Sequence, residues 1–168
     1  MRNLRYLGLF LVVCFLTLAM PPQAKAQLLF MPNALIGKPA PDFTLKNLEG
    51  KDLNMTKYRD GKSAIVFFWA TWCPHCRTAL KGLHQKKDEF EKKGIKLVLV
   101  DLGESVEEVR EHLLKAKMEL NIFMDMDTAL SESYGIIGVP TFYLVDKDGI
   151  VKYVEHALPK NYEGILSE

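Results

Sequence analysis

The feature that most constrains this chain is a continuous apolar run that leads directly into two closely spaced cysteines. The run, Ser63–Trp69 (SAIVFFW), shows no alternation of polar and apolar residues, which is typical of a strand buried on both faces. Pro74 follows the first cysteine, and proline is favoured in the first turn of a helix. We therefore predict a buried strand, a short turn, and a helix. Cys73 lies at the N-terminus of this helix, and Cys76 lies one turn further on.

Cys76 and four residues after it are spaced for one face of a helix. The separations between successive members of this set are 4, 3, 4 and 3 residues, which fits a helical period. Gly94 is placed where glycine commonly ends a helix. The sequence thus predicts one helix from Pro74 to near Gly94, with Cys76, Leu80, Leu83, Lys87 and Phe90 on the same face.

The rest of the chain carries further strand and helix patterns. Upstream, Phe43–Leu45 and Asp52–Met55 form a predicted hairpin around a turn at Asn47–Lys51. Downstream, the predicted strands are Ile95–Asp101, Thr141–Val145 and Ile150–Glu155, with Asn121–Met124 either a short strand or a loop. The predicted helices are one behind a capping box at Ser105–Glu108, one over Asp127–Tyr134, and one over Pro159–Leu166.

This order of elements predicts an α/β fold. Strand–helix–strand alternation gives a parallel central pair of strands, and the hairpin near the C-terminus gives an antiparallel edge. We expect a central mixed sheet flanked by helices, with an N-terminal β-hairpin extension.

The first 26 residues resemble an export signal. Arg2 and Arg5 precede an apolar stretch over Tyr6–Met20, and Ala24–Ala26 offers small residues for a signal peptidase. The alternative is an uncleaved membrane anchor, although the apolar stretch is shorter than the roughly 20 residues that span a bilayer. Cys14 lies within this segment and is expected to leave with it.

The predicted organisation is therefore a signal peptide over 1–26, a linker over 27–36, and a single domain over 37–168. Lys and Arg total 22 against 21 Asp and Glu, so no bulk positive charge is present to bind nucleic acid. We expect an extracytoplasmic location, either periplasmic or membrane-tethered, where a close cysteine pair is a disulfide or a redox site.

The spacing of Cys73 and Cys76 suits thiol chemistry. At a helix N-terminus the unpaired N–H groups favour an anion, and the thiolate is the nucleophilic form of cysteine. With an unperturbed thiol, only about 3% of Cys73 is ionised at pH 7. Cys76 lies one turn further on, within reach of a mixed disulfide formed by Cys73. We expect Cys73 to be the exposed thiol and Cys76 the buried one.

Two structural alternatives for the pair are less favoured. A zinc site requires further Cys or His ligands at ligand spacing, and His84, His112 and His156 are scattered singly. A purely structural disulfide closing so small a loop would restrict the unfolded chain little. The pair is therefore best interpreted as redox-active.

The motifs resemble a known family. The stretch Phe68–Cys76 (FWATWCPHC) resembles the active site of the thioredoxin superfamily, and Gly138–Phe142 (GVPTF) resembles its cis-proline loop. The segments Gly37–Leu45 and Leu144–Gly149 are similar to the TlpA/ResA-like branch of thiol-disulfide oxidoreductases. This resemblance covers about residues 36–154 and implies a thioredoxin-like fold.

The resemblance implies roles for individual residues. Cys73 is the attacking sulfur and Cys76 the resolving one, while Trp72 shapes the substrate surface. Pro140 would follow a cis bond, and Val139 would present backbone groups to a bound peptide. Trp69 and Tyr143 are interpreted as core residues.

Within the motif, Pro74 stiffens the turn and His75 tunes the redox pair. Pro-His between the cysteines resembles strongly oxidising, DsbA-like sites, where the histidine stabilises the thiolate and so the reduced form. The alternative for His75 is a solvated loop histidine.

The chain departs from the family at two acidic positions. Phe67 stands where thioredoxins carry a buried acid, and Ala79 stands where TlpA/ResA-like proteins often carry glutamate. The usual groups for removing a proton from Cys76 are therefore absent from these positions.

The predicted function is an exported thiol-disulfide oxidoreductase that exchanges disulfides with protein cysteines, in a direction left open. No metal and no organic cofactor is implied. Expected partners are cysteine-containing exported proteins and, as a candidate, a membrane thiol donor or acceptor; the protein is expected to be a monomer. The alternatives are a copper-binding module using Cys73 and Cys76, and a thiol peroxidase, for which Ala70 stands where threonine is wanted.

Overall fold

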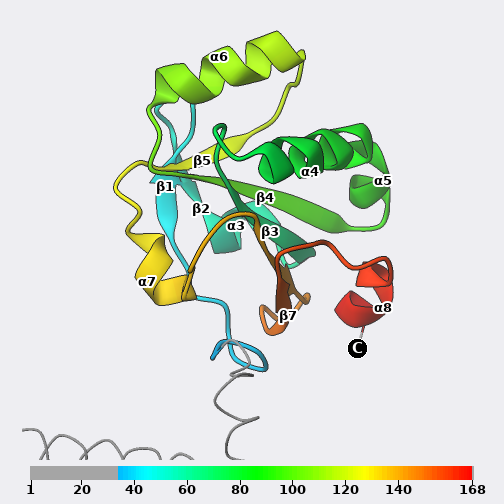
Figure 1. The fold of residues 1–168 in the computed structure, drawn as a ribbon. Helices are drawn as coiled ribbons and strands as arrows, with labels where there is room; N and C mark the ends of the chain where they lie inside the picture. Colours follow the sequence, from blue (N-terminus) through cyan, green and yellow to red (C-terminus); the bar gives the residue numbers. More distant parts are fainter. Residues whose placement is uncertain (1–33, 168) are drawn as a thin grey trace, which may run out of the picture. The chain divides into compact units, whose positions relative to one another are not determined.

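Seven strands form one mixed sheet in the order β2-β1-β5-β4-β3-β6-β7, with helices packed on it (Figure 1). The computed structural model describes residues 34–167, so the predicted signal segment and residues 27–33 of the predicted linker lie outside the described residues. The strands are β1 (Thr44–Lys46), β2 (Asp52–Asn54), β3 (Ser63–Trp69), β4 (Ile95–Leu102), β5 (Ile122–Asp125), β6 (Thr141–Val145) and β7 (Val151–Glu155). The helices are α3 (Met55–Arg59), α4 (Pro74–Gln85), α5 (Lys87–Lys92), α6 (Val106–Ala116), α7 (Leu130–Tyr134) and α8 (Tyr162–Ser167).

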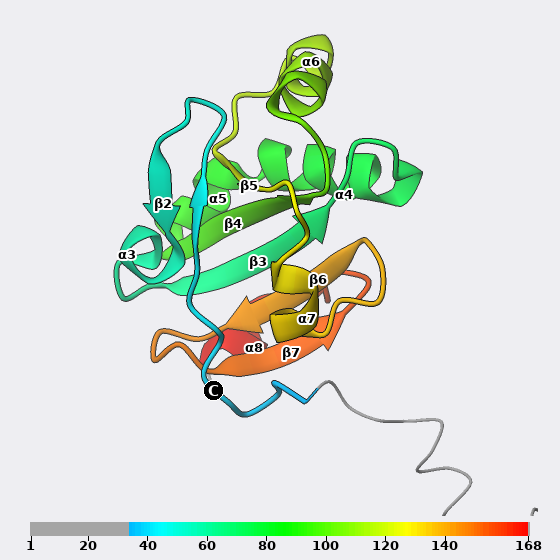
Figure 2. The ribbon, with the colours of Figure 1, turned by 90° about the vertical axis from the view of Figure 1, so that its left-hand side faces the viewer.

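The sheet is parallel at its centre and antiparallel at the β6–β7 edge, as predicted, and the β1–β2 hairpin makes the opposite edge antiparallel as well. Strands β3, β4 and β5 are parallel neighbours, while β6 runs antiparallel to β3 and β7 antiparallel to β6. Figure 2 shows the β1–β2 hairpin and the β6–β7 pair at opposite edges of the sheet. The segment Asn121–Met124, for which the sequence allows a strand or a loop, overlaps strand β5, which begins one residue later and extends to Asp125.

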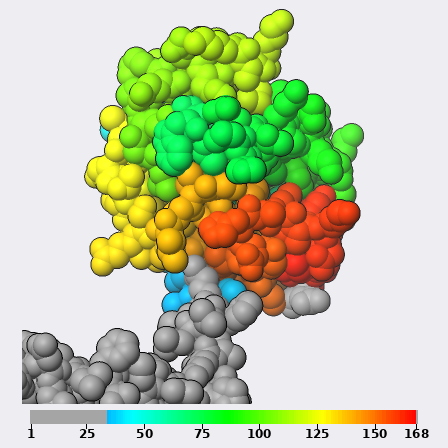
Figure 3. All heavy atoms as spheres, in the orientation of Figure 1, coloured from blue at the N-terminus to red at the C-terminus, as the bar shows by residue number. Residues whose placement is uncertain are grey.

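Strand β3 is buried on both faces, as its apolar sequence predicts. Phe67 and Trp69 belong to a core cluster with apolar residues of α4, α5, α6 and α8. Val66 and Phe68 belong to a second cluster with residues of α3 and α7. Because both faces are covered, the carboxyl end of β3 is held firmly where the cysteines follow. Figure 3 shows the packed surface of the same domain, with α4 and the C-terminal segment exposed on one face.

The single helix predicted from Pro74 to near Gly94 is wrong. The helix breaks at Lys86, whose N–H bonds to Leu83 O at 3.2 Å, three residues back. Phe90 nevertheless remains buried and packs edge-on against Tyr162, with ring centroids 5.4 Å apart. Lys87, which the pattern placed on the same face, is exposed because the turn rotates the chain between the two helices.

A second correction concerns Met55, which was predicted to end a strand. Strand β2 stops at Asn54, whose side chain accepts a hydrogen bond from Lys57 N at 2.9 Å and caps α3. Asparagine at this position is a common helix N-cap, so the signal was present in the sequence. No helix within residues 34–167 has the length and apolarity needed to cross a membrane.

Candidate active site

The two cysteines lie at the start of α4, after the loop that follows β3. A loop of three residues follows Trp69, and Cys73 is then the N-cap of α4, with Pro74 as the first helical residue. Cys73 and Cys76 form a disulfide with their Cα atoms 5.2 Å apart. Cys73 keeps 5% of its surface exposed, whereas Cys76 is fully buried. Cys76 is buried as predicted, but Cys73 is also buried in the disulfide form and not exposed, because its sulfur is bonded to Cys76 and faces the Val139 loop.

Cys73 caps the helix with its sulfur. Its backbone is extended, at φ −86° and ψ 112°, and its Sγ accepts from the N–H of Cys76 at 3.2 Å. When the pair is reduced, the same N–H group and the helix dipole favour a negative charge on this sulfur. The geometry therefore suits Cys73 as the nucleophile.

The loop that precedes β6 faces Cys73. The Val139–Pro140 peptide bond is cis, as predicted, and the carbonyl oxygen of Val139 lies 3.7 Å from Cys73 Sγ. Val139 is half-buried and packs against both core clusters. The loop thus places a backbone carbonyl beside the sulfur of Cys73.

His156 was not identified by sequence reasoning as part of this site. Its Nδ1 lies 2.7 Å from Pro140 O and 3.5 Å from Thr141 Oγ1. The imidazole thus tethers the cis-proline loop from the end of β7. No sequence pattern links His156 to Pro140, since only the pairing of β6 with β7 brings them together.

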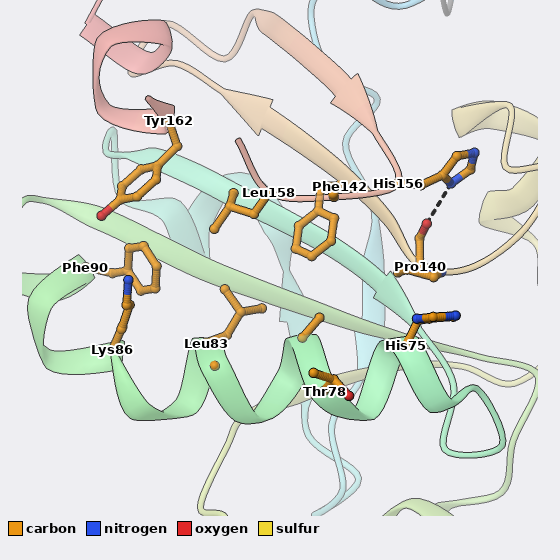
Figure 4. A pocket seen from close by; sticks show the side chains of 13 residues that line it. His75, Thr78, Leu83, Lys86, Phe90, Pro140, Phe142, His156, Leu158 and Tyr162 are labelled. Carbon is orange, nitrogen blue, oxygen red and sulfur yellow. Dashed lines mark hydrogen bonds between the residues drawn. The ribbon is translucent and has the colours of Figure 1, made fainter. Parts of the chain in front are cut away.

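Trp72 and His75 are the exposed residues of the motif. Trp72 is 67% exposed, as a residue that shapes an interaction surface would be. The His75 side chain is exposed, lies beside Pro140, and has no hydrogen-bond partner among residues 34–167 (Figure 4). In contrast, Trp69 and Tyr143 are fully buried core residues, as expected.

The two positions that lack the family acids are apolar in the structure. Phe67 is fully buried and stacks on Phe142, with ring centroids 4.4 Å apart. Ala79 is half-buried and lines the groove beside α4. Neither position offers a proton acceptor.

Two carboxyl groups nevertheless lie beside the redox loop, and sequence reasoning missed both. Glu104 accepts from Thr71 N and from Thr71 Oγ1, each at 2.5 Å. Asp101 is fully buried and pairs in register with Trp69 across β3 and β4. An acidic residue ending the apolar run of β4 was the available signal for Asp101.

Asp101 has an unusual electrostatic environment. Its carboxyl group is buried against Glu104. Trp69 Nε1 and His112 Nε2 are also buried, and neither has a hydrogen-bond partner within the described part of the chain. Burial, together with the nearby carboxyl of Glu104, raises the pKa of Asp101 to about 9. Burial and the charge of Arg77 lower the pKa of His112. The raised pKa favours the protonated, neutral form of Asp101.

The side chains near the cysteines do not assemble a metal centre. Within residues 34–167, no group of three or more His, Cys, Asp or Glu side chains is placed to hold a metal ion. The Cys73–Cys76 pair is suited to thiol-disulfide exchange.

Comparisons with known proteins agree with this fold and site. The model of the AhpC/TSA family matches residues 36–154. The chain is 32% identical over 119 residues to thiol-disulfide oxidoreductase ResA of Geobacillus thermodenitrificans, covering 71% of this chain and 68% of that protein. It is also 32% identical over 151 residues to thiol:disulfide interchange protein DsbE of Yersinia pestis, covering 88% and 78% of the two chains.

A solved structure carries the same fold. The thioredoxin domain of a thiol-disulfide oxidoreductase from Bacteroides vulgatus superposes with a TM-score of 0.67 at 26% identity, covering 77% of this chain and 94% of that one. The predicted thioredoxin-like fold is therefore confirmed. The chain belongs to the AhpC/TSA family and, within it, groups with the thiol-disulfide oxidoreductases ResA and DsbE.

Proposed function

We propose that the protein is an exported thiol-disulfide oxidoreductase that exchanges disulfides with cysteine-containing proteins through Cys73 and Cys76. One observation carries the proposal: Cys73 Sγ caps α4, accepts from Cys76 N at 3.2 Å, and lies 3.7 Å from Val139 O. A sulfur at a helix N-terminus, beside a backbone able to hold a peptide, is arranged for nucleophilic attack on a substrate disulfide.

The exchange proceeds in two steps. In the reductive direction, the Cys73 thiolate attacks one sulfur of a substrate disulfide, which forms an intermolecular disulfide and releases the other sulfur as a thiolate that takes up a proton. Cys76 then gives its proton to water and attacks the Cys73 sulfur, which forms the Cys73–Cys76 disulfide and frees the second substrate thiolate. The substrate gains the two electrons that the cysteine pair loses, and substrate oxidation is the reverse.

Residues around the pair position the substrate and tune the pair. The Val139 backbone is suited to pair with an extended peptide, and the exposed indole of Trp72 enlarges the contact surface. Pro74 begins α4 with a residue that lacks an N–H group. His75, next to the pair, stabilises the thiolate of the reduced form, which makes the disulfide a stronger oxidant.

Export is proposed from the sequence of residues 1–26, which carry the charged start, the apolar stretch and the Ala24–Ala26 segment of a cleaved signal. In the extracytoplasmic compartment that export reaches, the substrates are exported proteins with cysteines. A membrane thiol protein is the candidate electron partner there.

The experiment is a mixed-disulfide trap. Reduced Cys76→Ser protein is incubated with insulin, a disulfide-bonded substrate, and the products are separated on a non-reducing gel. We expect a covalent complex that reductant dissolves, because this variant lacks the resolving sulfur. Cys73→Ser is the control and should trap none; equal trapping by both variants, or none by either, would overturn the assignment.

A further inference from the structure

The loop that carries the redox pair is held at Thr71 by two charged side chains from different parts of the fold. Glu104, from the turn between β4 and α6, accepts from Thr71 N and from Thr71 Oγ1, each at 2.5 Å. Arg77, from α4, donates to Thr71 O at 2.9 Å. A carboxylate and a guanidinium group thus meet at the residue that lies two positions before Cys73.

Thr71 is fixed close to the reactive sulfur. Residues 70–73 form a tight turn, in which Cys73 N donates to Ala70 O at 3.3 Å. Neighbouring Cα atoms are 3.8 Å apart, so the Cα atoms of Thr71 and Cys73 are at most about 7.6 Å apart. The Glu104 carboxylate is bonded to the backbone N–H group of Thr71, and at this range buried charges are screened little by salt. Its charge therefore reaches the redox pair.

The two charges at Thr71 differ in their exposure to solvent. Glu104 keeps 8% of its surface exposed, whereas Arg77 is exposed. Water and salt screen an exposed charge far more than a buried one. The negative charge of Glu104 therefore acts on the redox pair more strongly than the positive charge of Arg77.

The neighbouring carboxyl group of Asp101 does not neutralise Glu104. Asp101 is fully buried, and its burial together with Glu104 raises its pKa to about 9. The raised pKa favours a proton on Asp101, which leaves Glu104 as the charged member of this pair of carboxyl groups. The N–H and hydroxyl groups of Thr71 donate to Glu104, as such groups do to an ionised carboxylate.

We propose that the Glu104 carboxylate, fixed on Thr71, tunes the redox pair by disfavouring a negative charge on Cys73 Sγ. A like charge nearby makes a thiolate less favourable, so the reduced form loses stability and the disulfide becomes a weaker oxidant. Glu104 then opposes the effect proposed for His75. The inference rests on the proposed function, because a reduction potential has a role only in a pair that exchanges disulfides.

Equilibration of the full chain with thiol-disulfide buffers tests the inference. The buffers are made with glutathione or with dithiothreitol, at about pH 8, near the unperturbed pKa of a cysteine thiol. Reduction of the Cys73–Cys76 disulfide takes two electrons and two protons from the buffer thiols, which form a disulfide in turn. A pair that no buffer reduces and reoxidises would mean that the proposed function itself is wrong.

Glu104→Gln removes the charge while its amide can keep both contacts with Thr71. We expect the equilibrium constant for reduction to rise at least about threefold, which corresponds to about 14 mV. The alkylation rate of Cys73 should reach half of its maximum at a lower pH, because the thiolate forms more easily. An equilibrium constant and a pH profile equal to those of the unaltered protein would leave the exchange chemistry intact and overturn this inference alone.

Two further variants separate the charge from the tether. Glu104→Asp keeps the charge on a shorter side chain, so the equilibrium constant should stay near that of the unaltered protein even where the fold loses stability. Glu107→Gln removes a charge from an exposed position on α6 and should leave the constant unchanged. An equal rise in Glu104→Asp and Glu104→Gln would assign the effect to the tether, and an equal rise in Glu107→Gln would assign it to net charge. Either result would overturn the inference.

Unfolding of both redox states supplies a second readout. A role in the fold alone would lower the free energy of unfolding of the oxidised and the reduced protein equally, and the potential would not move. Tuning requires that the reduced form of Glu104→Gln loses less stability than the oxidised form. Urea unfolding of each form measures the two losses, and equal losses would contradict the inference.

Discussion

The carboxylate of Glu104 accepts two hydrogen bonds from Thr71, one from its backbone N–H and one from its hydroxyl group, each at 2.5 Å. Arg77 donates a hydrogen bond to the backbone carbonyl oxygen of Thr71 at 2.9 Å. Thr71 immediately precedes Trp72 and the reactive cysteine. The loop that presents the redox pair is thus held by a side chain from the turn that follows β4.

Replacing Glu104 with glutamine should destabilise the fold. The amide oxygen can accept from Thr71 N while the amide N–H group donates to the Thr71 hydroxyl, so both contacts persist without the negative charge that strengthens them. Charge-assisted hydrogen bonds are roughly twice as strong as neutral ones, so we expect the free energy of unfolding to fall by about 1–2 kcal/mol. Urea unfolding measures the change, with the exposed Glu107→Gln on α6 as the control. Equal midpoints for the two variants would show that this contact contributes little.

Asp101 predicts a specific pH dependence of stability. Its folded-state pKa is about 9, against about 3.9 in an unfolded chain. Between these values the folded protein holds a proton that the unfolded chain releases, so the free energy of unfolding falls as pH rises through this window. Asp101→Asn removes this titration.

The measurement compares urea unfolding of oxidised Asp101→Asn and unaltered protein at about pH 5, 7 and 9, which spans the window. Other titrating groups affect both proteins, so the difference isolates Asp101. We expect the variant to gain stability relative to the unaltered protein as pH rises. A difference that stays constant across the three pH values would contradict a raised pKa at this carboxyl.

His75 should make the disulfide more oxidising. His75→Ala removes a neighbour that stabilises the Cys73 thiolate, so the reduced form is less favoured and the reduction potential falls. Equilibration with glutathione buffers measures the potential, and His84→Ala on the same helix serves as the control. A change of less than about 10 mV, one third of the roughly 30 mV that corresponds to about 1.4 kcal/mol, would show that His75 does not tune the reduction potential.

Cys73 should be alkylated before Cys76 in the reduced protein. Cys73 is the N-cap of α4 and keeps 5% of its surface exposed, whereas Cys76 lies inside the helix and keeps none. Brief treatment with iodoacetamide near pH 6, followed by peptide mass analysis, should show at least about tenfold more label on Cys73. Preferential labelling of Cys76 would reverse the roles of the two sulfurs.

Residues 1–26 should be absent from protein recovered from the organism that encodes it. The prediction rests on the charged start, the short apolar stretch and Ala24–Ala26. Intact-mass analysis measures the N-terminus directly. A mass that includes these residues would support the membrane-anchor alternative.

Much of the site could be predicted because its signals are local. The apolar run of β3, proline at the start of α4, and the capping box of Ser105 and Glu108 each lie within a few adjacent residues, and the structure contains all three. The helix break at Lys86 was missed because both α4 and α5 bury side chains at helical spacing, so the pattern looks continuous. A periodic pattern reports which residues are buried, but not where a turn interrupts the hydrogen bonds.

The sequence by itself determined the redox pair, its place at a helix N-terminus and the proline loop, since these depend on neighbouring residues and a family resemblance. Only the tertiary structure decided what surrounds them. Asp101 meets Trp69 through the register of two parallel strands, and His156 meets Pro140 through the pairing of β6 with β7. The groove beside α4, which Ala79 lines, likewise requires α4, β6 and the segment before α8 to come together. The physical reason is that sheet register and helix packing are set by burial summed over the whole core, which no short stretch of sequence contains.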